Sequence, residues 1–479
     1  MLFAVSINFA QRQKWFELES TPIKSFGDDQ FKTFDQLVDH FDNTNTKTFK
    51  QRFLVNSSVY KNGPLIIKLN GEGTLGTSQL SGQYSINYFA EEMNGFMVAL
   101  EHRYYGESKI DPGMKDMQYL SSKQAIADIS RFIPYIKELY QLQDSKVIVI
   151  GGCYTGNVAA WARIQLPFAI DAAIASSSPA MDILNFDGYM KYAQEQFIKI
   201  VSTQCYHNIT IALNALNKLL VEDPKQFKIF FGLTTQMPDE PTAEDIQVIS
   251  SYLSINIINQ IQYHYAQNYD NKGYKGSLQI ICDAFLGSLT DKSTEAEIIS
   301  AYIASVQRLN NYGELTYKAF IDSIKNPTAD SFNTRAWQWQ SCTELGYYQT
   351  TNSQIMWGDK QTIESYIKMC YDAFFSEYYE DPDLSLTIAY LNDMIDFTNA
   401  WYGARNTPRT HIYYTNGRVD PWSQLAVVQG LKWTDGQYVD DCVMEWIDNG
   451  SHCTDLYLSW KVNDPVREKQ LNKLKEWLM

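Results

Sequence analysis

The chain lacks any concentration of basic residues. Its 479 residues include 40 Lys and Arg against 55 Asp and Glu, which gives a formal net charge of −15 and a pI near 4.9. Proteins that bind a phosphate backbone gather lysine and arginine in one run or on one face, and no such run occurs in this sequence. The composition therefore argues against nucleic acid as a partner.

Long apolar runs are also missing. No stretch of about 18 uninterrupted apolar residues occurs, so the sequence predicts no membrane span. The apolar opening MLFAVSINFA has neither a basic segment before it nor an A-x-A cleavage site after it. It fits the remnant of a secretory signal or a mobile terminus, and we take the signal as our expectation.

Cysteine pairs of the C-x-x-C kind are absent, which argues against a structural zinc site. If one of the seven cysteines works as a thiol, the other six fit three disulfides in an oxidising compartment. The alternative is a cytosolic protein with all seven reduced. N-x-S/T sites at Asn56, Asn208 and Asn449 favour secretion or a lysosomal or vacuolar lumen. The pairing and the oligomeric state stay open, a homodimer being one candidate.

Apolar runs and helical patterns alternate along the first part of the chain. A chain of this length is expected to hold two domains, or one sheet domain with an insertion. Buried strands are predicted at Pro64–Asn70, Gly95–Leu100, Val147–Ile150 and Ala169–Ala175. This rhythm of strand and helix predicts a parallel sheet that helices cover on both faces.

The strongest helical pattern runs from Tyr119 to Tyr140. Isoleucines recur on one face at helical spacing, and Ser121 or Ser122 can cap the start. Pro134 inside the pattern is expected to kink or split the helix.

A change in the spacing of apolar residues divides the chain into three parts. From 182 to 335 apolar residues recur at helical intervals, and strand-like runs resume at His411–Thr415 and Val443–Ile447. We therefore expect a sheet domain formed by residues 1–181 and 336–479, with a helical cap at 182–335 inserted between late strands.

The segment Val147–Arg163, VIVIGGCYTGNVAAWAR, has the outline of a nucleophile elbow. In such a turn a strand passes sharply into a helix, and one side chain is lifted clear of the sheet beside the positive end of the helix dipole. The signature of the turn is G-x-S-x-G. Here Cys153 stands in place of the serine and Thr155 in place of the second glycine.

Two later residues complete a candidate catalytic triad. Asp420 and His452 each follow a late strand and a turn. The chain order of nucleophile, acid and histidine is that of α/β-hydrolases. The chemistry requires a histidine that holds the nucleophile's proton and a carboxylate that fixes the histidine tautomer. The sequence therefore predicts an α/β-hydrolase sheet domain with Cys153, Asp420 and His452 as catalytic residues.

The glycine-rich loop NGEGTLG after the first buried strand has two readings. In an α/β-hydrolase it supplies one oxyanion-hole N–H, here from Gly71, and the residue after the nucleophile, Tyr154, supplies the other. The loop also matches G-x-G-x-x-G, with Glu101 at the end of the next strand, which is the pattern of a dinucleotide site. The long spacing to Glu101 disfavours the nucleotide, and we expect no cofactor.

Several motifs resemble the serine peptidase family of lysosomal Pro-Xaa carboxypeptidase, dipeptidyl-peptidase II and thymus-specific serine protease. They are DHF, TF and QRF within 39–53, NGEG at 70–73, EHRYYGES at 101–108, YLSSKQAIAD at 119–128, GGCYTG at 151–156 where the family has GGSYGG, ASSSP at 175–179, QSCTELGYYQT at 340–350, TNGRVDPWS at 415–423 and GSHCTDL at 450–456. The resemblance implies a helical cap over the active site. It also implies cleavage after proline from one end of a short peptide under acidic conditions, with the triad on Cys153, Asp420 and His452.

The two departures at the elbow leave two main hypotheses. A thiol beside an imidazole is a competent nucleophile, although sulfur is larger than the oxygen for which the site is shaped. The first hypothesis is an active cysteine-nucleophile peptidase or acyl hydrolase of short peptides. The second is a non-catalytic homologue that binds peptides or a partner. A nucleotide-dependent enzyme ranks behind both. Trp422, Trp337 and Trp339 are candidate walls of a proline pocket, or else core residues.

Overall fold

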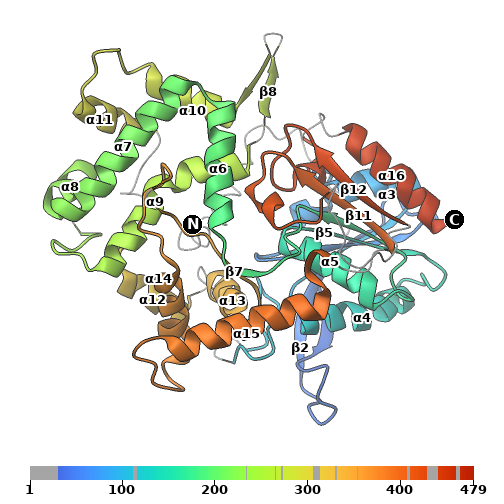
Figure 1. Ribbon diagram of the computed structural model, residues 1–479. Coiled ribbons are helices and arrows are strands. Elements are labelled where there is room, and N and C mark those ends of the chain that lie inside the picture. Colours follow the sequence, from blue (N-terminus) through green and yellow to red (C-terminus); the bar gives the residue numbers. More distant parts are fainter. Residues whose placement is uncertain are drawn as a thin grey trace.

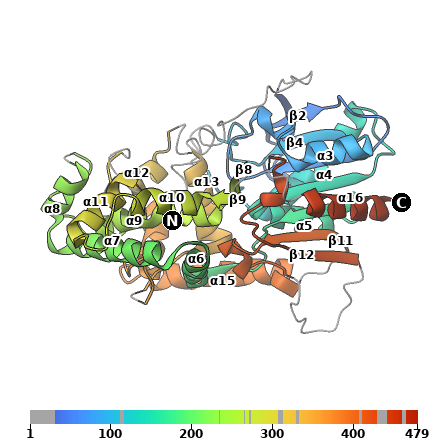
Figure 2. The same ribbon diagram turned by 90° about the horizontal axis from the view of Figure 1, so that it is seen from above.

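The protein divides visibly into a sheet half and a helical half (Figure 1). This computed structural model describes residues 31–479 except 112–115, 234, 265, 271–272, 306–312, 329–331, 353, 407–409, 429–440 and 460–463. The predicted signal segment MLFAVSINFA lies outside the described residues. Figure 2 shows the same two halves from above, with the helices α7 (Thr203–Glu222), α8 (Pro224–Phe231) and α11 (Glu295–Ser305) furthest from the sheet.

An eight-stranded sheet forms the core of the first half, in the order β1-β2-β4-β3-β5-β6-β11-β12. Strand β2 pairs antiparallel with both of its neighbours, β1 and β4. All the other neighbouring strands of this sheet pair parallel. The strands are β1 Lys32–Leu37, β2 Thr48–Asn56, β3 Leu65–Asn70, β4 Phe96–Glu101, β5 Val147–Gly152, β6 Ala172–Ser176, β11 Thr410–Gly417 and β12 Asp441–Ile447. The predicted parallel sheet is confirmed, apart from two antiparallel pairings at its β1 edge.

Helices cover both faces of this sheet, which explains its continuous apolar strands. On β5, Val147 and Val149 join the core on one face, together with side chains of α4 (Ser122–Leu139) and α5 (Tyr154–Gln165). Ile148 and Ile150 join the core on the other face, with side chains of α3 (Ser85–Met93) and α16 (Asp464–Leu478). A strand buried on both faces has no need of polar alternation. This three-layer arrangement is an α/β-hydrolase fold.

Helix α4 runs unbroken through Pro134, where a kink or a split was expected. Ser121 caps it by accepting from the Gln124 N–H, as predicted. Pro134 lies inside the helix without splitting it. Both Pro134 and Ser130, whose carbonyl the proline leaves without its helical partner, are exposed, so water can solvate that carbonyl. The cost of the missing hydrogen bond is therefore small enough for the buried isoleucine face to hold the helix together.

A helical segment separates β6 from β11. Its helices are α6 Asp187–Ile200, α7 Thr203–Glu222, α8 Pro224–Phe231, α9 Ala243–Gln262, α10 Ser277–Leu286, α11 Glu295–Ser305, α12 Tyr317–Lys325, α13 Phe332–Gln340, α14 Ile363–Cys370 and α15 Ser385–Tyr402. The last helices lie beyond residue 335, the predicted end of the cap. The division of the chain into domains stays a prediction.

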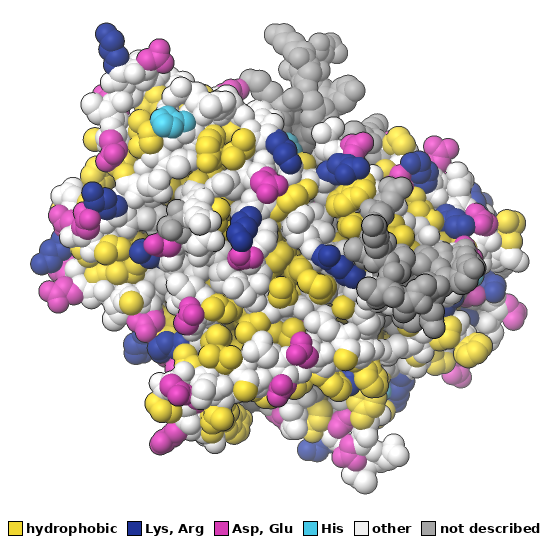
Figure 3. Space-filling view, viewed as in Figure 1, with side chains coloured by type: hydrophobic (Ala, Val, Ile, Leu, Met, Phe, Trp, Pro, Cys, Tyr) yellow, Lys and Arg dark blue, Asp and Glu magenta, His cyan; other side chains and the backbone are white. Residues whose placement is uncertain are grey.

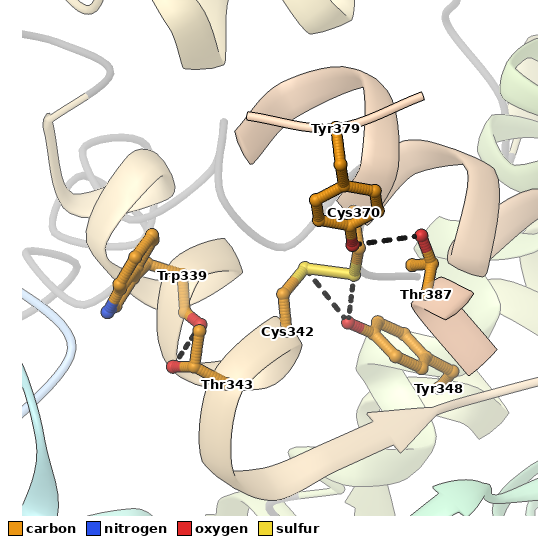
Figure 4. Close-up of a disulfide and its surroundings, with 7 residues drawn as sticks. All are labelled: Trp339, Cys342, Thr343, Tyr348, Cys370, Tyr379 and Thr387. Atoms are coloured by element: carbon orange, nitrogen blue, oxygen red, sulfur yellow. Dashed lines mark hydrogen bonds between the residues drawn. A yellow bond between two sulfur atoms is a disulfide. The ribbon is translucent and has the colours of Figure 1, made fainter. Parts of the chain in front are cut away.

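Two disulfides lie in this helical segment, Cys205–Cys282 and Cys342–Cys370. Figure 4 shows the second, with the Tyr348 hydroxyl 3.2 Å from the Cys342 sulfur and 2.9 Å from the Cys370 sulfur. The expectation of three disulfides among the six other cysteines is wrong, because Cys453 keeps a buried thiol. That thiol lies against the sheet, where it fills core space.

The surface of the protein tests the expectations about glycan sites, basic patches and membrane spans. Asn56 and Asn208 are buried at 4% and 6% exposure, so the folded protein has no room for a glycan on either, whereas Asn449 is exposed. On the face shown in Figure 3, lysine and arginine side chains are interspersed with aspartate and glutamate. Within the described residues, none of the helices has the length and apolar character that crossing a membrane requires.

Candidate active site

Cys153 occupies a sharp turn between β5 and α5. Its backbone has φ 57° and ψ −133°, a combination that L residues rarely adopt and that a nucleophile elbow demands. The neighbouring glycines make the turn possible. A Cβ on Gly151 would lie 1.9 Å from the Thr155 carbonyl oxygen, and one on Gly156 would lie 2.9 Å from the Ser178 Cβ. The strand and the helix therefore pass too closely for any side chain at these two positions.

Asp420 and His452 meet at the ends of the two last strands. The imidazole Nδ1 lies 2.8 Å from the Asp420 Oδ2, and both side chains are buried. The other carboxylate oxygen, Oδ1, accepts from the Trp422 N–H at 3.0 Å, which fixes the carboxylate in place. The His452 side chain is also hydrogen-bonded to the Cys153 thiol. The structure thus brings the three predicted residues together, although their catalytic roles remain a proposal.

The electrostatics of the site disfavour a free thiolate. Burial raises the pKa of the Cys153 thiol to about 11, against the opposing influence of the His452 imidazole. For His452, burial lowers the pKa, but the adjacent Asp420 carboxylate outweighs it and the pKa rises well above its usual value. The thiol is therefore neutral at ordinary pH. It passes its proton to the neutral form of His452 as it attacks, and because the pKa of His452 is raised, that form becomes more abundant as the pH increases.

We expect iodoacetamide to alkylate Cys153 slowly at pH 5 and faster as the pH rises. A pKa moved from 9.0 to about 11 leaves roughly 100-fold less thiolate than an ordinary thiol has at the same pH. The rate should climb about tenfold per pH unit below 11. Peptide mapping of the modified chain separates Cys153 from the other thiols. Fast alkylation that is independent of pH between 5 and 7 would instead reveal a preformed thiolate–imidazolium pair.

The helical segment closes over the triad at the end of α9. The backbone carbonyl of Gln262 accepts from the His452 N–H at 2.9 Å, and its side-chain oxygen accepts from the Trp422 Nε1 at 3.1 Å. The ring of Tyr263 stands edge-on to the imidazole, with centroids 5.8 Å apart. The sequence carries no signal for these contacts, because a helix end marked by Gln and Tyr has no distinctive pattern. They fix the loop on which His452 lies.

The predicted oxyanion-hole residues lie on either side of Thr155. The Tyr154 N–H belongs to the first turn of α5, where a helix leaves its N–H groups without partners in the helix. A Cβ on Gly71 would lie 2.4 Å from the Thr155 Cγ2. The Thr155 hydroxyl donates to the Gly152 carbonyl at 2.9 Å. A threonine at 155 therefore fits this elbow because residue 71 is glycine. Its hydroxyl stabilises the turn by the hydrogen bond to Gly152.

We expect Gly71→Ala to disrupt the site and Thr155→Gly to rescue it. The added methyl group would collide with a buried, β-branched side chain that its own hydrogen bond holds in place, so the loop must shift. Catalytic activity should fall by about 10- to 100-fold in Gly71→Ala. It should largely return in the double variant, where the methyl group has space. If the double variant is as impaired as Gly71→Ala alone, the contact does not control the loop.

The three predicted tryptophans lie in different surroundings. Trp422 is buried, with its ring centroid 6.2 Å from that of His452. Trp337 meets the Tyr154 ring edge-on at 6.2 Å. Trp339 packs edge-on against Phe374 at 5.4 Å, close to the disulfide seen in Figure 4. Trp422 and Trp337 thus contact neighbours of the nucleophile. A role in a proline pocket stays a prediction for all three.

The dinucleotide reading of NGEGTLG does not fit the structure. The loop leads into the short 3₁₀ helix Thr77–Leu80, where a nucleotide fold would place a long helix with its N-terminus at the phosphates. Glu101 is fully buried and accepts from Arg52 at 2.7 Å and from the Ser108 hydroxyl at 2.7 Å, so no ribose can reach it. Among the described residues, no three His, Cys, Asp or Glu side chains gather in a way that could hold a metal ion.

Comparison with known proteins gives one family and a consistent set of relatives. Residues 36–473 match the family described as Serine carboxypeptidase S28. A putative serine protease of Caenorhabditis elegans is 30% identical over 89% of this chain and 82% of its own. The human lysosomal Pro-X carboxypeptidase is 27% identical, over 93% and 87%. The mouse thymus-specific serine protease is 24% identical, over 93% and 86%.

Proposed function

Because the chain belongs to the serine carboxypeptidase S28 family and is a peptidase, we propose that it hydrolyses short peptides after proline with Cys153 as nucleophile. The observation that carries this proposal is the contact of His452 with both Asp420 and Cys153. The preference for proline is proposed by analogy with the lysosomal Pro-X carboxypeptidase among its relatives.

The residues divide the chemistry as follows. The Cys153 sulfur attacks the carbonyl carbon while its proton passes to the neutral His452, at the ring nitrogen that does not face Asp420. The N–H groups of Tyr154 and Gly71 stabilise the oxyanion that forms. Protonated His452 then gives the proton to the leaving amine, and a thioester remains on Cys153. Water, deprotonated by His452, releases the second product and restores the thiol. Asp420 holds the imidazole tautomer through both halves of the cycle.

We further propose a secreted or lysosomal or vacuolar location. The two disulfides favour an oxidising compartment. Asn449, with its exposed side chain, is the N-x-S/T site on which a glycan fits the fold. A lysosomal protein is among the relatives.

The test compares the native chain with Cys153→Ser on two proline peptides. One has a free amino end and a fluorophore after proline, and the other has a blocked amino end and a free carboxyl end. We expect the native chain to cleave one of the two, which also distinguishes a dipeptidyl-peptidase from a carboxypeptidase. Activity that appears only in Cys153→Ser would mean that the native site binds peptides without cleaving them, and the proposal would be wrong.

A further inference from the structure

A buried network of hydrogen bonds passes through Tyr154, the residue that follows the nucleophile. The Tyr154 hydroxyl lies 3.1 Å from the His102 Nε2 and accepts from the Gln340 Nε2 at 2.9 Å. The Gln340 Oε1 in turn accepts from the Tyr105 hydroxyl at 2.7 Å. All four side chains are at most 6% exposed. The triad mechanism uses none of these hydroxyl, amide or imidazole groups.

The direction of each hydrogen bond is fixed. The His102 Nδ1 lies 2.8 Å from the Arg103 carbonyl oxygen, which can only accept, so the proton is on Nδ1. Burial lowers the pKa of His102 to about 4, so the ring is neutral and its Nε2 accepts from the Tyr154 hydroxyl. The tyrosine oxygen keeps its acceptor capacity for Gln340. A fully satisfied buried network of this kind allows one side-chain arrangement.

This hydrogen-bond network joins the two halves of the molecule at the elbow. His102 directly follows β4 of the sheet, and Gln340 is the last residue of α13 in the helical segment. Tyr154 is the first residue of α5, so its side chain and its N–H are fixed by the same backbone. A tilt at this residue would move the N–H relative to the Cys153 sulfur.

We propose that His102 and Gln340 are positioning residues. They hold the Tyr154 side chain, and thereby keep the Tyr154 N–H of the oxyanion hole in a fixed position relative to the Cys153 sulfur. The inference deepens the proposed function and rests on it for its kinetic consequence. It also assigns a role to two family-like segments, EHRYYGES and QSCTELGYYQT, which the triad leaves unexplained. The helical segment thereby contributes to catalysis through Gln340 without touching the substrate.

The experiment removes the polar groups while keeping the shape. Gln340→Met and Tyr154→Phe, alone and together, are compared with Gln361→Met. Gln361 is an equally buried glutamine whose Nε2 donates to the Gln247 carbonyl at 2.9 Å, elsewhere in the helical segment. Two measurements are made on each variant: steady-state kinetics with the proline peptide, and hydrogen exchange of the peptide that spans 147–163.

We expect kcat to fall by about 10- to 100-fold in Gln340→Met with KM nearly unchanged, because the oxyanion hole acts on the transition state. The double variant should be no worse than the more impaired single variant, since both break one chain. Exchange in 147–163 should rise in these variants and not in Gln361→Met. A loss shared equally by Gln361→Met, or unchanged kcat and exchange, would overturn the proposal.

The two readouts also separate this inference from the proposed function. If the chain lacks activity with either cysteine or serine at 153, the proposed function fails, and faster exchange at the elbow in Gln340→Met still supports the hydrogen-bond chain as its anchor. If peptides are cleaved but neither readout changes in Gln340→Met, the proposed function stands and this inference fails.

Discussion

Asp420→Asn is expected to lower kcat/KM by about 10⁴-fold while the fold stays intact. The carboxylate accepts from the His452 Nδ1 at 2.8 Å in a fully buried setting, so it decides which ring nitrogen faces the thiol. An asparagine at 420 can turn its NH₂ group towards Nδ1, which places the ring proton on Nε2. The imidazole can then no longer accept a proton from Cys153.

The same substitution should change the pH dependence of what activity remains. The Asp420 carboxylate raises the pKa of His452, so its removal lets burial lower that pKa. The base form of the histidine is therefore present down to lower pH in the variant, and the rising limb of the pH–rate profile should move to lower pH.

A matched control is Asp448→Asn, since Asp448 has an exposed side chain and pairs with Arg418 at the surface near the same loops. It should retain full activity, because a surface ion pair contributes little. An Asp420→Asn chain that keeps activity within several-fold of the native value would show that Asp420 is structural. Circular dichroism of both variants verifies that the fold is retained.

Cys153→Ala is expected to abolish turnover, with a loss of at least about 10⁴-fold. No other described nucleophile shares the strained turn at φ 57°, the N-terminus of α5 and the hydrogen bond to His452. Alanine keeps the backbone of the turn and removes only the sulfur. Stability should change little, because Cys153 is half-buried and its thiol is not part of a disulfide.

Cys442→Ala serves as the comparison for a thiol outside the triad, on β12. It should keep activity near the native value, whereas Cys153→Ala should still bind a proline peptide with unchanged affinity. That combination separates a missing nucleophile from a damaged pocket. Residual activity in Cys153→Ala above a tenth of the native rate would remove Cys153 from the mechanism.

The sequence predicted the parts of the molecule that depend on local patterns. The apolar run Val147–Ile150 predicted a strand buried on both faces, and the glycines beside Cys153 predicted the sharp turn. Chain order then predicted that Asp420 and His452 would meet, because parallel strands end at one edge of the sheet. These residues follow strands whose direction the fold fixes.

What the sequence could not predict depends on contacts between distant segments. The fit of Thr155 depends on the absence of a side chain at Gly71, a contact that no spacing rule reveals. The hydrogen bond from the His452 N–H to the Gln262 carbonyl depends on how the helical segment packs on the sheet. Counting cysteines suggested a third disulfide, but Cys453 is instead packed as a buried thiol against the sheet beside Gly152.

The most direct test of the account is to look for the acyl group on Cys153. The native chain is mixed with a proline peptide ester, whose fast acylation makes thioester breakdown the slow step, and is quenched in acid for peptide mass spectrometry. We predict a mass gain equal to the acyl half of the substrate on Cys153, within 147–163. Turnover without that adduct, or with the adduct on another residue, would contradict the account.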